Sequence, residues 1–170
     1  MLSMHRFLFR DIFDHAGEYR RYNIAKKEPV LGGRSVVYAD FRSIRDTLAY
    51  DFREEKDYEY YDMSHEKMVR HISKFVSDIW QVHPFMEGNT RTTVLFTERY
   101  LRSLGFDVDN EMFARHARYF RNALVRANYA DFQRGIYADH SYLEQFFDNL
   151  IYHADHRLQS RDLILQKLVE

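Results

Sequence analysis

The sequence predicts an all-α domain that carries one small β-hairpin. Apolar residues recur with the 3.6-residue period of an α-helix along most of the chain, and a single segment places β-prone stretches around a glycine pair. The chain has 170 residues, 45% of them hydrophobic and 16% aromatic, which is enough to bury one core. We therefore expect one domain over residues 1–170, with a core over about 4–152 and a C-terminal helix over about 155–169.

The longest expected helix lies in "SHEKMVRHISKFVSDIWQV". Ser64 or Asp62 is placed to cap its N-terminus, and Pro84 disfavours a helical conformation at His83, where we expect the helix to end. Its apolar residues follow helical spacing and predict that it packs in the core: Met68, Ile72, Phe75, Val76, Ile79 and Trp80.

A second helix is expected in "RTTVLFTERYLRSLG", which Gly105 is suited to end. Four other segments have helical spacing and are predicted to be helices as well. They are Leu8 and Ile12 before Gly17, Ile44 and Leu48 after Asp40, Phe113 to Leu124 after Asn110, and Leu143 to Ile151.

One segment departs from the helical pattern. In "EPVLGGRSVVYAD" two β-prone stretches flank Gly32 and Gly33, and such a pair supplies the positive φ angles that a two-residue hairpin turn needs. We expect a small hairpin on a helical body, and a plain loop is the alternative that the residues leave open.

The charge of the chain argues against a polyanion as its main ligand. The 25 basic and 26 acidic residues are spread along the sequence, with a formal net charge of -1, so we expect no nucleic acid partner. No run approaches the roughly 18 apolar residues of a membrane span, and the N-terminus becomes charged too early for a secretory signal. The absence of cysteine suits a reducing compartment. The sequence predicts a cytoplasmic protein that binds no membrane.

The densest set of polar side chains lies in "VHPFMEGNTRTT". A helix that ends near His83 and another that starts near Asn89 leave a loop that brings backbone N–H groups to a helix N-terminus, where anions bind. Gly88 allows a ligand to approach closely, and Arg91 adds a forked cation suited to phosphate oxygens. With the N–H group of Thr90, these residues predict a polyphosphate site.

Glu87 and His83 add reactive groups to this loop. A carboxylate beside phosphate requires a cation, and Mg²⁺ commonly binds one carboxylate plus phosphate oxygens. His83 can accept a proton near neutral pH and has no serine or cysteine beside it to activate, so the nucleophile would come from a substrate. Each residue also has a purely structural interpretation: His83 as a charge at a helix end, Asn89 or Thr90 as an N-cap, and Arg91 as the partner of a nearby carboxylate.

The residues "HPFMEGNTR" resemble the signature of Fic domains, HPFx(D/E)GNxR. The resemblance extends along the chain: "MHRFLFRDIFDHAGEYRRYNIAKKE" is similar to the N-terminal pattern of the family, and "YFRNALVRANYADFQRGI" with "YLEQFFDNLI" is similar to its closing helices. It implies a compact Fic-type helical bundle with one β-hairpin, called the flap.

The resemblance implies a protein adenylyltransferase that transfers AMP from ATP to a Ser, Thr or Tyr hydroxyl of a target protein. His83 matches the general base of the family, and Glu87 matches its acidic ligand of Mg²⁺. The segment that holds the phosphates of ATP matches the residues Gly88, Asn89, Thr90 and Arg91.

The flap and the chain ends carry the partner contacts that we expect. An exposed strand at Ser35, Val36 and Val37 would pair with an extended segment of the target by main-chain hydrogen bonds. No serine or threonine is followed four residues later by glutamate, so the self-inhibitory (S/T)xxxE(G/N) motif of many Fic proteins is absent from the sequence. We expect the activity to be restrained by an antitoxin-like inhibitor in trans, or by a segment outside this sequence. The terminal "LQSRDLILQKLVE" is expected to form an amphipathic helix for packing or self-association.

Two residues depart from the family pattern. Thr90 stands where glycine is common, and Val94 stands where many members have a second arginine that grips the terminal phosphate, which leaves the nucleotide donor open. Two further hypotheses are retained: a Doc-like protein phosphotransferase, although its loop typically carries lysine at the position of Thr90, and a non-catalytic nucleotide-binding module. Whether the protein acts as a toxin, an effector or a housekeeping regulator is also open.

Overall fold

The structure, a computed structural model, describes residues 1–165. Three 3₁₀ helices, η1 (Pro29–Leu31), η2 (Phe132–Arg134) and η3 (Ser160–Leu163), accompany the α-helices, and the predicted all-α fold is confirmed. Within the described range, no helix has both the length and the apolar composition to cross a membrane. The α-helices are α1 (Leu2–Phe9), α2 (Ile44–Lys56), α3 (His65–Val82), α4 (Asn89–Ser103), α5 (Glu111–Arg115), α6 (Ala117–Ala127) and α7 (Ser141–Tyr152).

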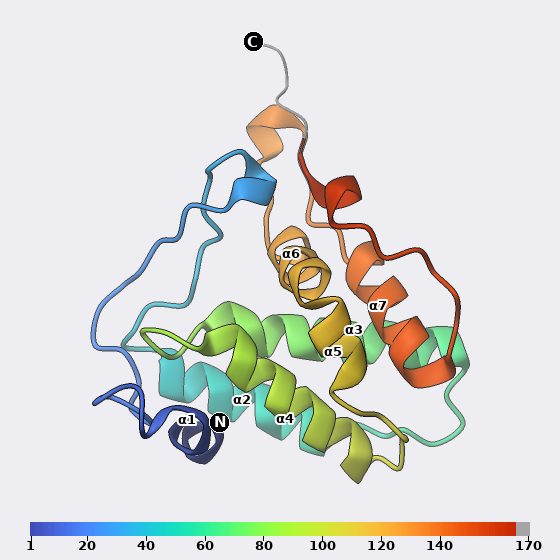
Figure 1. The fold of residues 1–170 in the computed structure, drawn as a ribbon, viewed down its shortest axis with the longest axis horizontal. Coiled ribbons are helices and arrows are strands. Elements are labelled where there is room, and N and C mark those ends of the chain that lie inside the picture. Colours follow the sequence, from blue (N-terminus) through green and yellow to red (C-terminus); the bar gives the residue numbers. More distant parts are fainter. Residues whose placement is uncertain (166–170) are drawn as a thin grey trace.

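Helix α3 forms the centre of the fold. It packs against α2, α4, α6 and α7, and Figure 1 shows α6 above α3, α2 and α4 in the lower half of the molecule, and α7 at the right, where it overlaps α3 in this view. The Ser64 hydroxyl accepts the Lys67 N–H at 3.4 Å and caps α3, as expected. The helix ends before His83, whose left-handed backbone has a φ of 48°. The predicted extent of this helix is confirmed.

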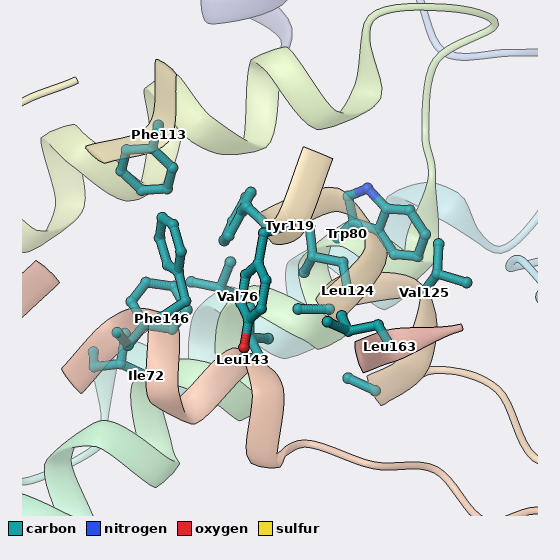
Figure 2. Close-up of a cluster of buried hydrophobic side chains, with 14 of the residues drawn as sticks. Ile72, Val76, Trp80, Phe113, Tyr119, Leu124, Val125, Leu143, Phe146 and Leu163 are labelled. Carbon is teal, nitrogen blue, oxygen red and sulfur yellow. The ribbon is translucent and has the colours of Figure 1, made fainter. Parts of the chain in front are cut away.

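The core divides into two clusters of buried side chains. The larger one lies among α3, α6 and α7 and includes Trp80, Leu124 and Phe146, which Figure 2 shows together. The smaller one joins α2 to α3 and contains Ile44, Leu48, Phe75, Ile79 and Val82. Because Trp80 belongs to one cluster and Val82 to the other, packing on both sides fixes the C-terminal end of α3.

The expected hairpin is reduced to a single bridged turn. Gly32 and Gly33 have the expected positive φ angles, 64° and 89°, but the bridge there pairs only Glu28 with Arg34. No β-strand is present within residues 1–165. Pro29 cannot donate a ladder hydrogen bond and instead begins η1, which fills the turn.

Two other predicted helices differ in extent. Helix α1 ends at Phe9 rather than at Gly17, because the chain turns back and the Gly17 N–H donates to His5 Nδ1 at 2.8 Å. The helix expected after Asn110 is divided into α5 and α6 at His116, whose φ of -115° departs from the helical value.

The predicted C-terminal helix over 155–169 is wrong for residues 155–165. This segment contains only the 3₁₀ helix η3, and the rest of it has no regular secondary structure. Arg126 donates to the Leu163 carbonyl at 2.9 Å, and the Leu163 side chain is fully buried, so tertiary contacts with α6 outweigh local helix propensity. The remaining residues of the predicted helix lie outside the described residues.

Candidate functional site

The motif loop, residues 83–88, joins α3 to α4 and depends on two positive φ angles. His83 has a φ of 48° and Gly88 a φ of 78°. A Cβ atom at Gly88 would lie 2.4 Å from Cε2 of Phe9, far inside van der Waals contact. Only glycine therefore fits at this position, and the close approach brings the loop against α1.

Side chains from the N-terminal segment hold the carbonyl groups of the motif loop. Arg20 is buried and donates from Nε to the His83 carbonyl at 2.8 Å, while its backbone N–H donates to the Pro84 carbonyl at 2.8 Å. His5 donates from Nε2 to the Glu87 carbonyl at 3.0 Å, since its Nδ1 accepts a backbone N–H. The loop is thus fixed by residues far away in the sequence.

The first residue of α4 completes this arrangement. The Asn89 side-chain oxygen accepts the Phe85 N–H at 2.8 Å, and its amide group donates to the Phe85 carbonyl at 2.7 Å. By contrast, the backbone N–H groups of residues 86–91 donate to none of the described residues. The loop therefore offers N–H donors at a helix N-terminus while most of its carbonyl acceptors are occupied, which is the composition of an anion-binding site.

His83 is held as a neutral imidazole. Its ring is 2% exposed and stacks on Tyr38 with ring centroids 4.0 Å apart. Because the Trp80 carbonyl can only accept, the hydrogen bond of 3.2 Å to His83 Nδ1 places the proton on Nδ1 and leaves a lone pair on Nε2. Burial lowers the pKa of His83 to about 3, and the positive charge of Lys26 acts in the same direction. The ring therefore carries a free lone pair on Nε2 at neutral pH, and the negative charge of a phosphate bound beside it would raise its pKa and so its strength as a base.

Glu87 is the carboxylate that could hold a cation beside this loop. Its side chain is 60% exposed, and its Oε2 lies 3.7 Å from Lys26 Nζ. The described residues contain no group of three His, Cys, Asp or Glu side chains that could hold a metal ion. A single carboxylate next to free N–H groups fits Mg²⁺ when phosphate oxygens and water supply the other ligands. Glu87 would therefore hold Mg²⁺ jointly with a nucleotide.

The first turn of α4 borders an apolar pocket of about 380 Å³. Thr90 has no positive φ, and its Oγ1 accepts the Trp80 indole N–H at 3.0 Å, so a threonine fits this position without backbone strain. The Arg91 guanidinium lies 4.5 Å from the centre of the Phe9 ring. Thr90 and Arg91 line one part of the pocket, and Val94 lines it one turn further along α4, where it supplies no charge.

The segment after the bridged turn contains the predicted target-binding residues. Val36 is buried, whereas Val37 is 80% exposed, and the Ser35 hydroxyl accepts the Lys26 N–H at 3.1 Å. The backbone N–H groups of residues 35–39 donate to none of the described residues. Unpaired N–H groups on an extended stretch can bind another extended chain by main-chain hydrogen bonds, and here Val37 is where the stretch meets solvent.

Sequence reasoning missed the residues that connect the turn to the site. Glu28 is fully buried and accepts from Arg121 Nη2 at 2.9 Å and from the Tyr38 hydroxyl at 3.4 Å, so the turn is anchored to α6 and to the ring that stacks on His83. It also missed the roles of His5 and Arg20. Both lie in the N-terminal segment that resembles the Fic pattern, which was the one available signal.

The same residues can be compared with known families. Residues 1–101, more than half of the chain, match the Fic/DOC family. The chain belongs to the Fic/DOC family. A protein of Sinorhizobium fredii named "Probable protein adenylyltransferase y4lH" is 25% identical to this Fic/DOC chain over 125 residues, which cover 74% of the chain and 62% of that protein. The chain thus spans less than two thirds of the length of this relative.

Solved structures of Fic domains share the fold at low sequence identity. The BepC protein of Bartonella tribocorum with bound AMPPNP has a TM-score of 0.65 and 18% identity to this Fic/DOC chain, and the match covers 88% of the chain and 71% of BepC. The N-terminal Fic domain of a VirB-translocated effector of Bartonella quintana with bound ADP has a TM-score of 0.64 and 17% identity, with coverage of 88% and 70%. The helical arrangement is therefore that of a Fic domain.

Proposed function

We propose that the chain is a protein adenylyltransferase that transfers AMP from ATP to a hydroxyl side chain of a target protein. The observation that carries the proposal is the free row of N–H groups at residues 86–91 beside the neutral, proton-accepting ring of His83. The name of the Sinorhizobium fredii relative and the nucleotides bound to the Bartonella proteins support the same chemistry.

The reaction requires a base, a held phosphate chain and an aligned hydroxyl. His83 Nε2 accepts the proton of the target hydroxyl, whose oxygen then attacks the α-phosphorus while the bond to the β-phosphate oxygen breaks. The N–H groups of Gly88 and Asn89 stabilise the charge on the phosphoryl oxygens, and Arg91 holds the outer phosphates. When bound at Glu87, Mg²⁺ would neutralise phosphate charge. Positioning and electrostatics thus supply most of the rate enhancement.

The target would bind along residues 35–39. Its extended segment would pair with the free N–H groups of this stretch, and the exposed Val37 side chain would contact it directly. Tyr38 joins this stretch to the site, because its ring stacks on His83. Pairing there would bring the target hydroxyl to the base.

The experiment uses the pure chain with Mg²⁺, cell lysate and ATP labelled at either the α- or the γ-phosphate. We expect label from the α position to enter protein with the wild-type chain and to be lost with His83→Ala. Label from the γ position alone would assign a phosphotransferase instead. Absence of label from either position, with nucleotide still bound, would overturn the catalytic proposal in favour of a binding module.

A further inference from the structure

Two cations lie beside the motif loop. The Arg91 guanidinium lies over the Phe9 ring, 4.5 Å from its centre. The Lys26 ammonium lies 3.7 Å from the Glu87 carboxylate, and its charge is the largest electrostatic contribution that lowers the pKa of His83.

Two arginines make smaller contributions to the same pKa. Arg121 is bound to the buried Glu28 carboxylate, and Arg20 to backbone carbonyls. The phosphoryl group that reacts must lie next to His83, so Lys26 is the cation in this set whose charged group can turn to it.

The position of Lys26 is defined from two sides. Its backbone N–H donates to the Ser35 hydroxyl at 3.1 Å, which ties it to the stretch proposed to bind the target. Its Nζ lies 3.7 Å from Glu87 Oε2, and its side chain is 28% exposed. Within residues 1–165 this is the only ion pair that Lys26 makes. The ammonium group is therefore half-buried, close to the base, and paired with the residue that would hold Mg²⁺.

This ion pair has little value for folding. Glu87 is largely exposed, and ion pairs in contact with solvent contribute little to stability. A lysine ammonium is a compact charge on a flexible stem, so Nζ can move to a phosphate oxygen without any change of the backbone. When a nucleotide and a divalent cation bind together, Lys26 can leave Glu87 for a phosphate oxygen, and Glu87 can bind the cation.

We propose that Lys26 is a further catalytic residue, which binds a non-bridging oxygen of the phosphoryl group to be transferred after its ion pair with Glu87 opens. In the transfer, the target oxygen bonds to the α-phosphorus, the bond to the bridging oxygen breaks, and pyrophosphate leaves with that electron pair. The hydroxyl proton passes to His83 Nε2. Lys26 takes no part in the proton transfer, and its ammonium group stabilises the charge on the phosphoryl oxygens throughout. This inference rests on the proposed function.

The test measures binding of the ATP analogue AMPPNP by calorimetry, with Mg²⁺ and with EDTA. Lys27 is the matched control, because it is the neighbouring lysine, is exposed, and makes no ion pair with the described residues. We expect Lys26→Met to weaken binding about tenfold with EDTA and by a smaller factor with Mg²⁺, Lys26→Arg to retain most of the affinity under both conditions, and Lys27→Met to leave it unchanged. Because Glu87 is then free, Mg²⁺ should strengthen binding by a larger factor in Lys26→Met than in the wild type.

The outcomes separate this proposal from the proposed function. If Lys26→Met binds AMPPNP as tightly as Lys27→Met does, the role of Lys26 is overturned, even when the wild type transfers label from the α-phosphate. If the wild type transfers no label but Lys26→Met binds weakly with the altered Mg²⁺ dependence, the phosphate contact stands and adenylyl transfer is overturned. If both hold, the transfer rate of Lys26→Met should fall at least about tenfold below that of Lys27→Met.

Discussion

The motif loop and the stretch of residues 35–39 both border His83 and differ in their exposure to solvent. In both, side chains hold carbonyl groups: Arg20 donates to the His83 carbonyl in the loop and to the Ala39 carbonyl in the stretch. The N–H groups of residues 86–91 and of residues 35–39 alike donate to none of the described residues. Phe85 in the loop, however, is fully buried, whereas Val37 is 80% exposed. The difference teaches that the part which would position the reacting groups is held rigidly in the core, while the part which would meet a variable partner is open to solvent.

The largest effect is expected where the rigid loop loses its buried anchor. Arg20 donates to the carbonyls of Tyr22, Ala39, Val82 and His83. Because Arg20→Met leaves these acceptors without partners, we expect the free energy of unfolding to fall by about 4 kcal/mol, measured by denaturant titration. The adjacent Arg21 is exposed and, among residues 1–165, forms an ion pair only with Glu18, so Arg21→Met should change the free energy of unfolding by less than about 0.5 kcal/mol. Equal losses of unfolding free energy in the two variants would show that Arg20 stabilises the fold no more than an exposed arginine does.

Gly88→Ala acts on the same loop and should lower the free energy of unfolding somewhat less than Arg20→Met does. The added Cβ would clash with the Phe9 ring at 2.4 Å and would adopt a φ of 78°. We expect a loss of about 3 kcal/mol from overpacking and backbone strain together. Gly105→Ala is the control, since its φ of 93° is also positive but nothing lies within 4 Å. It should cost only about 1 kcal/mol in the same titration.

The contribution of the motif loop to stability should also depend on pH, because the loop contains the buried His83. The pKa of His83 is lowered to about 3 in the folded state, below the value near 6.5 of an unfolded chain. The neutral ring therefore contributes stability above pH 6.5 that is lost as pH falls toward 3. Between pH 7 and 4.5 we expect the wild type to lose about 2 kcal/mol more unfolding free energy than His83→Ala. Parallel losses in the two proteins would contradict the buried neutral histidine.

The anchor of the open stretch is expected to be weaker than that of the loop. Glu28→Gln keeps the shape of the buried side chain and one acceptor oxygen but removes the charge that faces Arg121, which is 36% exposed, so we expect a loss of about 2 kcal/mol. The turn closed by the Asp131–Ile136 bridge has a similar backbone, with a 3₁₀ helix and a left-handed glycine. In that turn the acidic residue, Asp131, is half-buried, pairs with Arg134 at 2.7 Å and accepts the Tyr129 hydroxyl at 3.5 Å. Asp131→Asn should lower the unfolding midpoint less than Glu28→Gln does.

The smallest effect on stability is expected at Val37. This side chain is 80% exposed, so Val37→Ala should change the free energy of unfolding by less than about 0.5 kcal/mol. It should nevertheless slow the transfer of label to protein targets while leaving AMPPNP affinity unchanged. Val36→Ala, at the buried neighbour, should cost about 2 kcal/mol. Loss of nucleotide affinity in Val37→Ala would place this residue in the nucleotide site instead.

The elements set by neighbouring residues were predictable from the sequence. Helix α3 begins after its Ser64 cap and ends before His83 and Pro84, and α4 begins at Asn89, as local spacing and capping indicate. The glycine pair at 32 and 33 has the positive φ angles that its turn requires. These features depend on contacts within a few positions along the chain, so a single sequence carries enough information to place them.

Contacts between distant segments decided the rest. Arg20 reaches His83 across 63 positions, and His5 reaches Glu87 across 82, so no local pattern relates either residue to the site. Long-range contacts also hold the C-terminal segment against α6 in place of the predicted helix. Burial and hydrogen bonding depend on what the whole chain packs around a group, and that packing is defined only once the fold is complete.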